Sequence, residues 1–117
     1  NCGQVCLGTE RVYVERPLFD KFVAAMKKGA ESLVLSVPDD KTTNMGPLIS
    51  KEHQRKVLSY YELAQAEGAT IVTGGGVPQM KGDLNEGCWV QPTIWTGLKR
   101  IFPQCLITMA MMRPRRM

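Results

Sequence analysis

The feature that most constrains the fold is an amphipathic helical pattern in the first third of the chain. Across residues 18–33, apolar side chains recur at steps of three and four, at Leu18, Phe19, Phe22, Val23, Met26, Ala30 and Leu33. This spacing places them on one face of a helix, which must pack against another element. Pro17 stands in the first turn of this helix, where a missing N–H costs no helical hydrogen bond.

A second helical segment follows a connector, residues 37–49, that is rich in Pro, Asp, Asn and Gly. Ser50 is a favourable N-cap, and Gly68 suits the left-handed residue that ends many helices. The apolar side of the segment carries Val57, Leu58, Tyr61 and Ala64. We therefore expect a second amphipathic helix between Ser50 and Gly68.

Three segments have the composition of strands. Residues 9–15 alternate apolar and charged positions, residues 69–73 are expected to form a short buried strand, and residues 89–95 are expected to be extended. Pro92 lies within the last segment and implies an edge or a bulge there. The alternation of strands and helices predicts an α/β fold with a mainly parallel sheet.

The length of 117 residues allows one small domain, which excludes a whole enzyme that holds a dinucleotide and a second substrate. No apolar run reaches the roughly 18–20 residues of a bilayer span, so no membrane association is expected. The first residue is Asn1 rather than Met, and we expect the chain to be a piece of a larger protein.

The net charge of +4 is concentrated at one end. Residues 1–98 contain ten Lys and Arg against eleven Asp and Glu, whereas residues 99–117 contain five basic residues and no acidic one. A nucleic-acid-binding domain would spread its basic residues over a folded face. We therefore expect no nucleic-acid partner, and a salt-dependent binder acting through the basic segment is the alternative.

The four cysteines are too sparse for the disulfide framework of a small secreted domain, so reduced thiols in a cytoplasmic protein are the expectation. Cys2 and Cys6 lack a second ligand pair at matching spacing, and His53 is the single histidine of the sequence. We therefore predict no metal site.

Cys6 is the strongest candidate for chemistry. Gly3 and Gly8 lie on either side of it, and such small residues allow a substrate carbonyl to approach the sulfur and the neighbouring N–H groups. A thiolate there could attack an electrophilic carbonyl. The alternative, which composition and spacing alone favour, is a small buried apolar residue, as most free cysteines are.

The sequence of residues 1–6, Asn-Cys-Gly-Gln-Val-Cys, resembles the Asn-x-Gly-Gln-x-Cys segment around the nucleophile of the aldehyde dehydrogenase superfamily. The resemblance continues in the same order through residues 9–14, 17–23, 44–50, 67–69, 74–76 and 91–94. It covers residues 1–98 and is greatest for the 2-hydroxymuconic and 2-aminomuconic semialdehyde dehydrogenases. It implies that residues 1–98 are a partial catalytic domain whose dinucleotide-binding domain is missing.

The resemblance also implies a reaction. Cys6 would be the nucleophile of an NAD- or NADP-dependent enzyme that oxidises a small-molecule aldehyde to a carboxylate through a thiohemiacetal and a thioester. The Cys6 N–H would be one oxyanion donor, and the complete enzyme would be a homo-oligomer. The family's general base, its oxyanion Asn and its cofactor domain all precede the position of Asn1. We therefore expect this chain alone to be inactive and to bind the cofactor poorly, and its cofactor-binding residues are unknown.

Residues 99–117 depart from the family. Members carry a Glu-Ile-Phe-Gly-Pro element whose Glu contacts the cofactor ribose, whereas residues 100–104 read Arg-Ile-Phe-Pro-Gln. We interpret residues 99–117 as a divergent and irregular basic segment, produced by a shifted reading frame or a rearranged end.

Other features have simpler interpretations. Residues 74–76, three glycines, precede Val77 and Pro78 rather than a helix, which favours a turn over a phosphate cradle. His53 and Lys56 correspond to a helix that can lie near the cofactor ribose in the family, but a solvated helix face also explains them. Finally, the chain is alternatively a non-catalytic remnant that binds an intact homologue or aggregates through exposed sheet edges.

Overall fold

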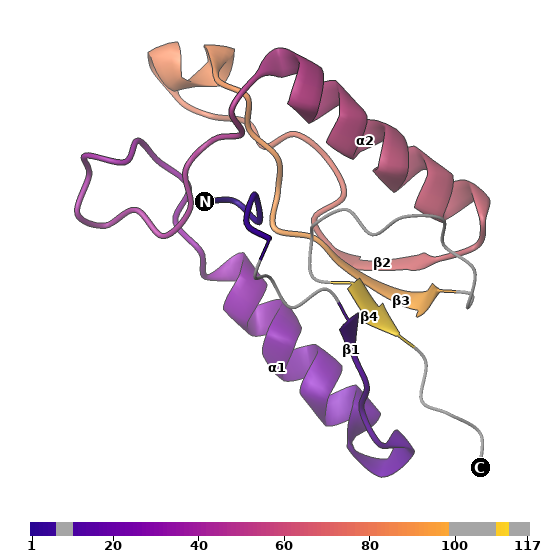
Figure 1. The fold of residues 1–117 in the computed structure, drawn as a ribbon. Helices are drawn as coiled ribbons and strands as arrows, with labels where there is room; N and C mark the ends of the chain where they lie inside the picture. The colour runs from indigo at the N-terminus through magenta and orange to yellow at the C-terminus, as the bar shows by residue number, and fades with distance from the viewer. Residues whose placement is uncertain (7–10, 99–109, 113–117) are drawn as a thin grey trace.

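The computed structural model describes residues 1–6, 11–98 and 110–112. Two helices, two short 3₁₀ segments and four strands follow one another along the described chain (Figure 1). Their bounds are β1 Arg11–Val12, η1 Arg16–Leu18, α1 Phe19–Glu31, α2 Lys51–Ala66, β2 Thr70–Thr73, η2 Gly82–Glu86, β3 Ile94–Leu98 and β4 Ala110–Met112. Neither described helix combines the length and the apolar character that crossing a membrane requires.

The four strands form one sheet in the order β1-β4-β3-β2. β4 pairs parallel with both β1 and β3, whereas β2 pairs antiparallel with β3. The sheet is therefore mixed, and the prediction of a mainly parallel sheet is not confirmed. Residues 74–93 join β2 to β3 and contain the 3₁₀ segment η2 but no α-helix, which is the usual connection between parallel neighbours.

The predicted cap residues of α2 are confirmed. The Ser50 hydroxyl accepts a hydrogen bond from the His53 N–H at 3.1 Å, and Gly68 follows the helix with φ of 84°. Val57, Tyr61 and Ala64 are buried, while Leu58 packs on the same cluster and is partly buried. These residues join Leu48, Val90 and Trp95 in the hydrophobic core, so α2 covers the face of the sheet at β3.

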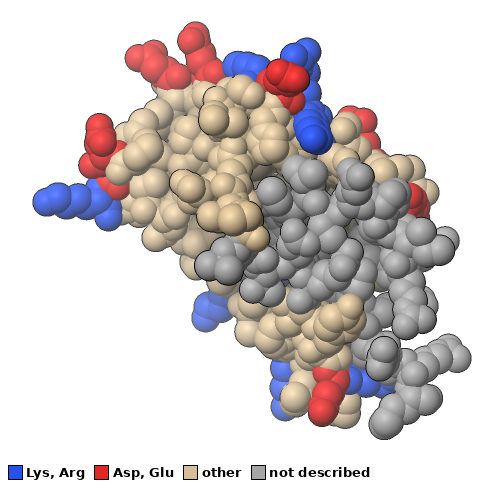
Figure 2. Space-filling view, in the orientation of Figure 1, with Lys and Arg blue, Asp and Glu red and all other residues tan. Residues whose placement is uncertain are grey.

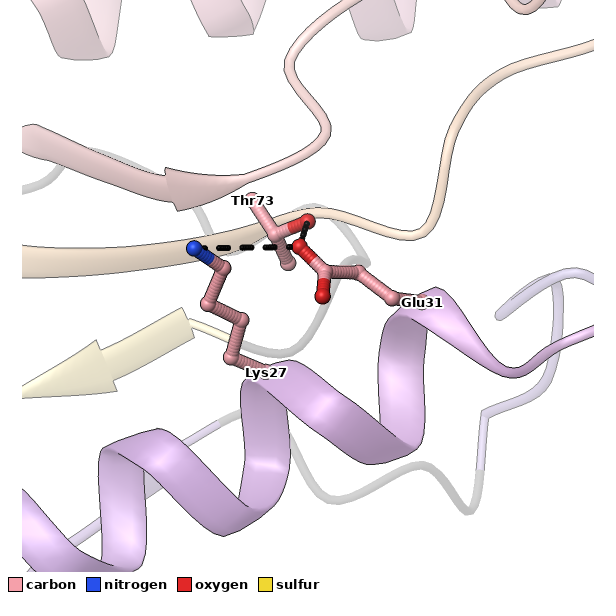
Figure 3. Close-up of polar contacts among 3 residues, drawn as sticks. All are labelled: Lys27, Glu31 and Thr73. Atoms are coloured by element: carbon pink, nitrogen blue, oxygen red, sulfur yellow. Dashed lines mark hydrogen bonds and ion pairs between the residues drawn. The ribbon is translucent and has the colours of Figure 1, made fainter.

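The predicted first helix is also present, but its apolar face is only partly buried. None of the residues of α1 is buried, and Leu18 is exposed just before it. A polar contact ties its last turn to β2, because the Thr73 hydroxyl donates to Glu31 Oε1 at 3.1 Å while Lys27 Nζ lies 3.8 Å from the same oxygen (Figure 3). In the view of Figure 1, α1 and α2 lie on opposite sides of the sheet.

The strand predictions are partly wrong in position and burial. β2 falls within residues 69–73, yet Thr70 is exposed and the rest are half-buried, so it is not the buried strand expected. β3 begins only at Ile94. Pro92 has no N–H to donate to a neighbouring strand, and the Gln91 N–H donates to the Gly76 carbonyl, which lies outside the strands, at 2.9 Å. The pairing irregularity expected at Pro92 lies in β2, between Ile71 and Thr73.

Within residues 99–117, the structure describes only Ala110–Met112, which form β4 between β1 and β3. The expectation of an irregular segment therefore does not hold at these three residues. The remaining residues of the segment lie outside the described part, as do residues 9 and 10 of the first predicted strand.

Figure 2 shows how charge is distributed over one face of the molecule. Basic and acidic side chains lie around the margin of this face, and the described residues in its middle are uncharged. Within the described residues, no basic patch covers the visible face. This distribution agrees with the near-neutral balance of residues 1–98.

Candidate active site

The segment that contains the candidate nucleophile is a tight turn at the start of the chain. Cys2 and Gly3 both adopt positive φ, at 53° and 77°. The Gln4 N–H donates to the Asn1 carbonyl at 2.9 Å, and the Val5 N–H donates to the Gly3 carbonyl at 2.8 Å. A positive φ is uncommon for a residue other than Gly, so the surrounding contacts must hold Cys2 in this conformation.

The Gln4 side chain attaches this turn to the body of the domain. Its Nε2 donates to the Asn1 carbonyl at 3.0 Å, and its Oε1 accepts from the Ile49 N–H at 3.1 Å. The sequence did not indicate this role, since Gln4 was considered only as one position of the Asn-x-Gly-Gln-x-Cys motif. No local signal could have found it, because the partner lies 45 residues away and contributes a backbone atom.

Cys6 lies at the end of the turn with an exposed side chain. The burial that the alternative interpretation requires is therefore not observed. Among the residues that the structure describes, none accepts a hydrogen bond from the Cys6 N–H. An exposed sulfur next to a backbone N–H suits nucleophilic attack on a carbonyl, because such a donor can stabilise the oxyanion.

The neighbouring thiol, Cys2, has a different environment. Cys2 is partly buried and packs against the hydrophobic core. Burial raises the pKa of the Cys2 thiol above its ordinary value of 9.0, and the nearby N-terminal ammonium opposes this only in part. Cys2 therefore carries little thiolate at neutral pH, which disfavours it as a nucleophile.

Residues 74–76 do not fit the phosphates of a dinucleotide. A Cβ at Gly74, which has φ of 77°, would collide with the Pro92 carbonyl oxygen and with Thr93 Oγ1. The glycine is required by this close approach of two chain segments, and the described chain does not enter a helix directly after it. The interpretation as a turn is supported, and the described residues provide no glycine-rich turn leading into a helix for NAD or NADP.

The remaining candidates are dispersed over the structure. His53 is half-buried and Lys56 is exposed, both on α2. Within the described residues, no group of three or more Cys, His, Asp and Glu side chains could hold a metal ion. Cys2, Cys6 and Cys88 are all free thiols.

Comparisons with known proteins identify the family of the chain. The model of the aldehyde dehydrogenase family matches residues 1–103. The chain therefore belongs to the aldehyde dehydrogenase family.

Two of the similar curated proteins are named as semialdehyde dehydrogenases. A 2-hydroxymuconic semialdehyde dehydrogenase of Pseudomonas sp. (strain CF600) is 69% identical over 98 residues, which are 84% of this chain and 20% of that protein. A 2-aminomuconic 6-semialdehyde dehydrogenase of Pseudomonas sp. is 53% identical over 98 residues, which are again 84% of this chain and 20% of that protein. The chain thus spans about one fifth of the length of these relatives.

Solved structures of the family contain the same fold. Betaine aldehyde dehydrogenase from Staphylococcus aureus, in complex with NAD⁺, matches with a TM-score of 0.89 at 34% identity. The match covers 99% of this chain and 24% of that one. The NAD⁺ complex of aldehyde dehydrogenase from Bacillus cereus gives 0.86 at 32% identity, over 97% of this chain and 23% of that one.

Proposed function

We propose that this chain is the nucleophile-bearing segment of the catalytic domain of an NAD- or NADP-dependent aldehyde dehydrogenase. The observation that carries the proposal is the exposed Cys6 sulfur at the end of an anchored turn, next to an N–H that has no acceptor among the described residues. The similarity to 2-hydroxymuconic and 2-aminomuconic semialdehyde dehydrogenases supports a muconic semialdehyde as the substrate.

In the proposed reaction, the Cys6 thiolate adds to the aldehyde carbon and forms a thiohemiacetal. The carbonyl oxygen becomes an oxyanion that accepts a hydrogen bond from the Cys6 N–H, and a donor of this kind contributes about 3–4 kcal/mol in comparable sites. The dinucleotide, when bound, supplies the hydride acceptor. Water then hydrolyses the resulting Cys6 thioester to the carboxylate and restores the thiol.

The isolated chain is proposed to be inactive. Its residues supply a nucleophile and one oxyanion donor, but the described residues provide no glycine-rich turn that leads into a helix, and the chain spans one fifth of the length of its relatives. Such a chain has lost most of the interactions that bind a transition state more tightly than the substrate. Incubating the purified chain with NAD⁺ and 2-hydroxymuconic semialdehyde should produce no NADH, and accumulation of NADH would contradict the proposal.

Cysteine reactivity in a relative supports the role proposed for Cys6. A point mutant of the Staphylococcus aureus enzyme was solved with NAD⁺ and with a BME-modified cysteine. The proposal extends to a cytoplasmic location and a homo-oligomeric complete enzyme. The free thiols are consistent with the reducing location, and isolation of the complete protein followed by gel filtration would measure its assembly.

The sheet topology favours a second candidate, a non-catalytic remnant that pairs with an intact homologue. β1 and β2 are the outer strands of the described sheet, and β2 pairs only with β3 along its one partnered side. Exposed edges of this kind template pairing with other chains. Gel filtration of the chain, alone and mixed with an intact homologue, tests this candidate. A chain that elutes as a monomer in both cases and forms no complex with the homologue would contradict it.

A further inference from the structure

Gln4 joins two parts of the structure that are otherwise separate in sequence. Its carboxamide bridges the Asn1 carbonyl, within the turn, and the Ile49 N–H, in the connector before α2. Each end of the carboxamide therefore has one partner, with the amide nitrogen donating and the oxygen accepting. Oxygen and nitrogen are assigned consistently by these two partners, because a flipped amide would place two donors against each other at Ile49.

The connector end of this bridge is a fixed point. Leu48 is buried, and its N–H donates to the Cys88 carbonyl at 2.9 Å. Ser50, on the other side, caps α2 through its side chain. Ile49 lies between these two anchors and leaves 85% of its own side chain exposed, so its N–H, rather than its side chain, connects it to the turn.

The turn end of the bridge is two residues from Cys6. Cys2 packs on the core and Gln4 is bonded to the connector, so the turn is attached at two points before the chain reaches Val5 and Cys6. Both attachments precede the nucleophile and restrict the direction in which its sulfur and its N–H point. Catalytic geometry is sensitive to such restriction, since displacements of about 1 Å can reduce rates about 100-fold.

We propose that Gln4 is a positioning residue, which aligns the Cys6 sulfur and the Cys6 N–H on the same carbonyl group by tying the turn to Ile49. Gln4 does not contact the substrate in this proposal and acts through the backbone of the turn. The inference rests on the proposed role of Cys6 as nucleophile.

The test compares two reactions of Cys6 in the full 117-residue chain. In acylation by p-nitrophenyl acetate, the thiolate attacks the carbonyl carbon, an oxyanion forms and p-nitrophenolate leaves, so the aligned N–H accelerates the reaction. In alkylation by iodoacetamide, the thiolate displaces iodide and no oxyanion forms. The ratio of the two rates, followed at Cys6 by peptide mapping, therefore reports alignment and is independent of the amount of thiolate.

In the wild-type chain, the ratio of acylation to alkylation should exceed that of the same chain unfolded in urea. Gln4→Met, which has similar length and no hydrogen-bonding groups, should lower the ratio about tenfold, towards the unfolded value. Gln4→Glu keeps an acceptor for the Ile49 N–H and should stay within about threefold of wild type. If Gln4→Met does not fold, Gln4→Asn replaces it, because its shorter side chain cannot bridge both partners.

A second glutamine provides the control for stability. The Gln54 side chain is buried and donates to the Trp89 carbonyl at 2.7 Å, so Gln54→Met should lower the free energy of unfolding. It should leave the ratio at Cys6 unchanged, since it does not touch the turn. An equal loss of the ratio in Gln54→Met and Gln4→Met would overturn the positioning role.

Two further results would also overturn it: a Gln4→Met ratio equal to wild type, or a wild-type ratio equal to that of the unfolded chain. Neither result decides whether Cys6 is the nucleophile of the complete enzyme. That question has its own measurement, the exchange of Cys6 within a complete homologue, so failure of the inference and failure of the proposed function are distinguishable.

Discussion

The rings of Tyr61 on α2 and Trp95 on β3 contact each other with their centroids 5.8 Å apart and their planes tilted by 58°. Tilted geometry of this kind is the favourable arrangement for two aromatic rings. Both residues are about 4% exposed, and the contact is the centre of the cluster that holds α2 on the sheet. The connector that anchors Gln4 leads directly into this helix, so the stability of the α2 packing underlies the geometry of the candidate site.

Replacing Trp95 should therefore destabilise the domain strongly. Trp95→Ala should lower the free energy of unfolding by about 3–5 kcal/mol, because it removes a large buried ring and leaves a cavity. Urea denaturation followed by circular dichroism measures this change. Tyr13→Ala is the control, since Tyr13 is 70% exposed and its removal should change the value by less than about 0.5 kcal/mol.

The N-cap of α2 gives a smaller and more local prediction. Ser50→Ala should cost about 0.5–2 kcal/mol of unfolding free energy, because the His53 N–H loses its acceptor. Ser50→Asp should retain most of this stability, because a carboxylate caps equally well and interacts favourably with the helix dipole. Ser59→Ala on the exposed side of the same helix should have little effect. Equal losses in Ser50→Ala and Ser59→Ala would contradict the capping role.

Two glycines should respond to alanine in opposite directions. Gly74→Ala should destabilise the domain by at least about 1–3 kcal/mol, because φ is positive and a Cβ would collide with the Pro92 carbonyl. Gly29→Ala should stabilise it by about 0.5–1 kcal/mol, because Gly29 lies within α1 and, beyond the adjoining backbone, no described residue comes within 4 Å of the added Cβ. Thermal or urea denaturation of the two variants measures the sign of each change in the free energy of unfolding.

The connector should contribute a pH-dependent term through Asp40. The Thr42 N–H and hydroxyl donate to Asp40 Oδ1 at 2.8 and 2.7 Å, and these bonds lower the pKa of the carboxyl below its ordinary value of 3.8. Because the pKa is lower in the folded state, the stabilisation is present above the unfolded pKa and is lost as the pH falls through the folded value. NMR titration of Asp40 should give a pKa below 3.8, and a value above it would contradict this.

The matched variants for this term are Asp40→Asn and Asp39→Asn. Asp40→Asn should weaken the decline in urea midpoint at acid pH, because its side chain does not titrate. Asp39 is exposed and makes no hydrogen bond with another residue in the described part of the chain, so Asp39→Asn should leave that decline in place.

The helices and their ends could be predicted because their signals are local. Ser50 and Gly68 bound α2 through contacts within a few residues of each cap, and the apolar spacing identifies the buried face. The sheet could not be predicted in the same way, since the direction in which β2 pairs with β3 depends on the path of the whole intervening chain. Pro92 shows the limit, because an edge or a bulge is expected at this residue, whereas β3 begins after it at Ile94 and the pairing irregularity lies between Ile71 and Thr73.

The sequence indicates a candidate nucleophile, which stays a prediction, but it does not indicate the geometry around that residue. The Asn-x-Gly-Gln-x-Cys pattern indicated Cys6, but no pattern in the sequence indicated that Gln4 bonds the Ile49 N–H, because any residue other than proline offers the same backbone donor there. The different environments of Cys2 and Cys6, two thiols four residues apart, likewise depend on which side of the turn faces the core.

The most direct test of the proposed function is a hybrid in which part of this chain replaces the matching segment of a complete relative. Residues 1–98 should replace the matching segment of the 2-hydroxymuconic semialdehyde dehydrogenase of Pseudomonas sp. (strain CF600), and NADH production from the semialdehyde should be measured with and without Cys6→Ser. The account predicts an active hybrid that Cys6→Ser inactivates, while Cys2→Ser leaves it active. An active hybrid that retains its rate after Cys6→Ser would contradict the assignment of Cys6 as the nucleophile.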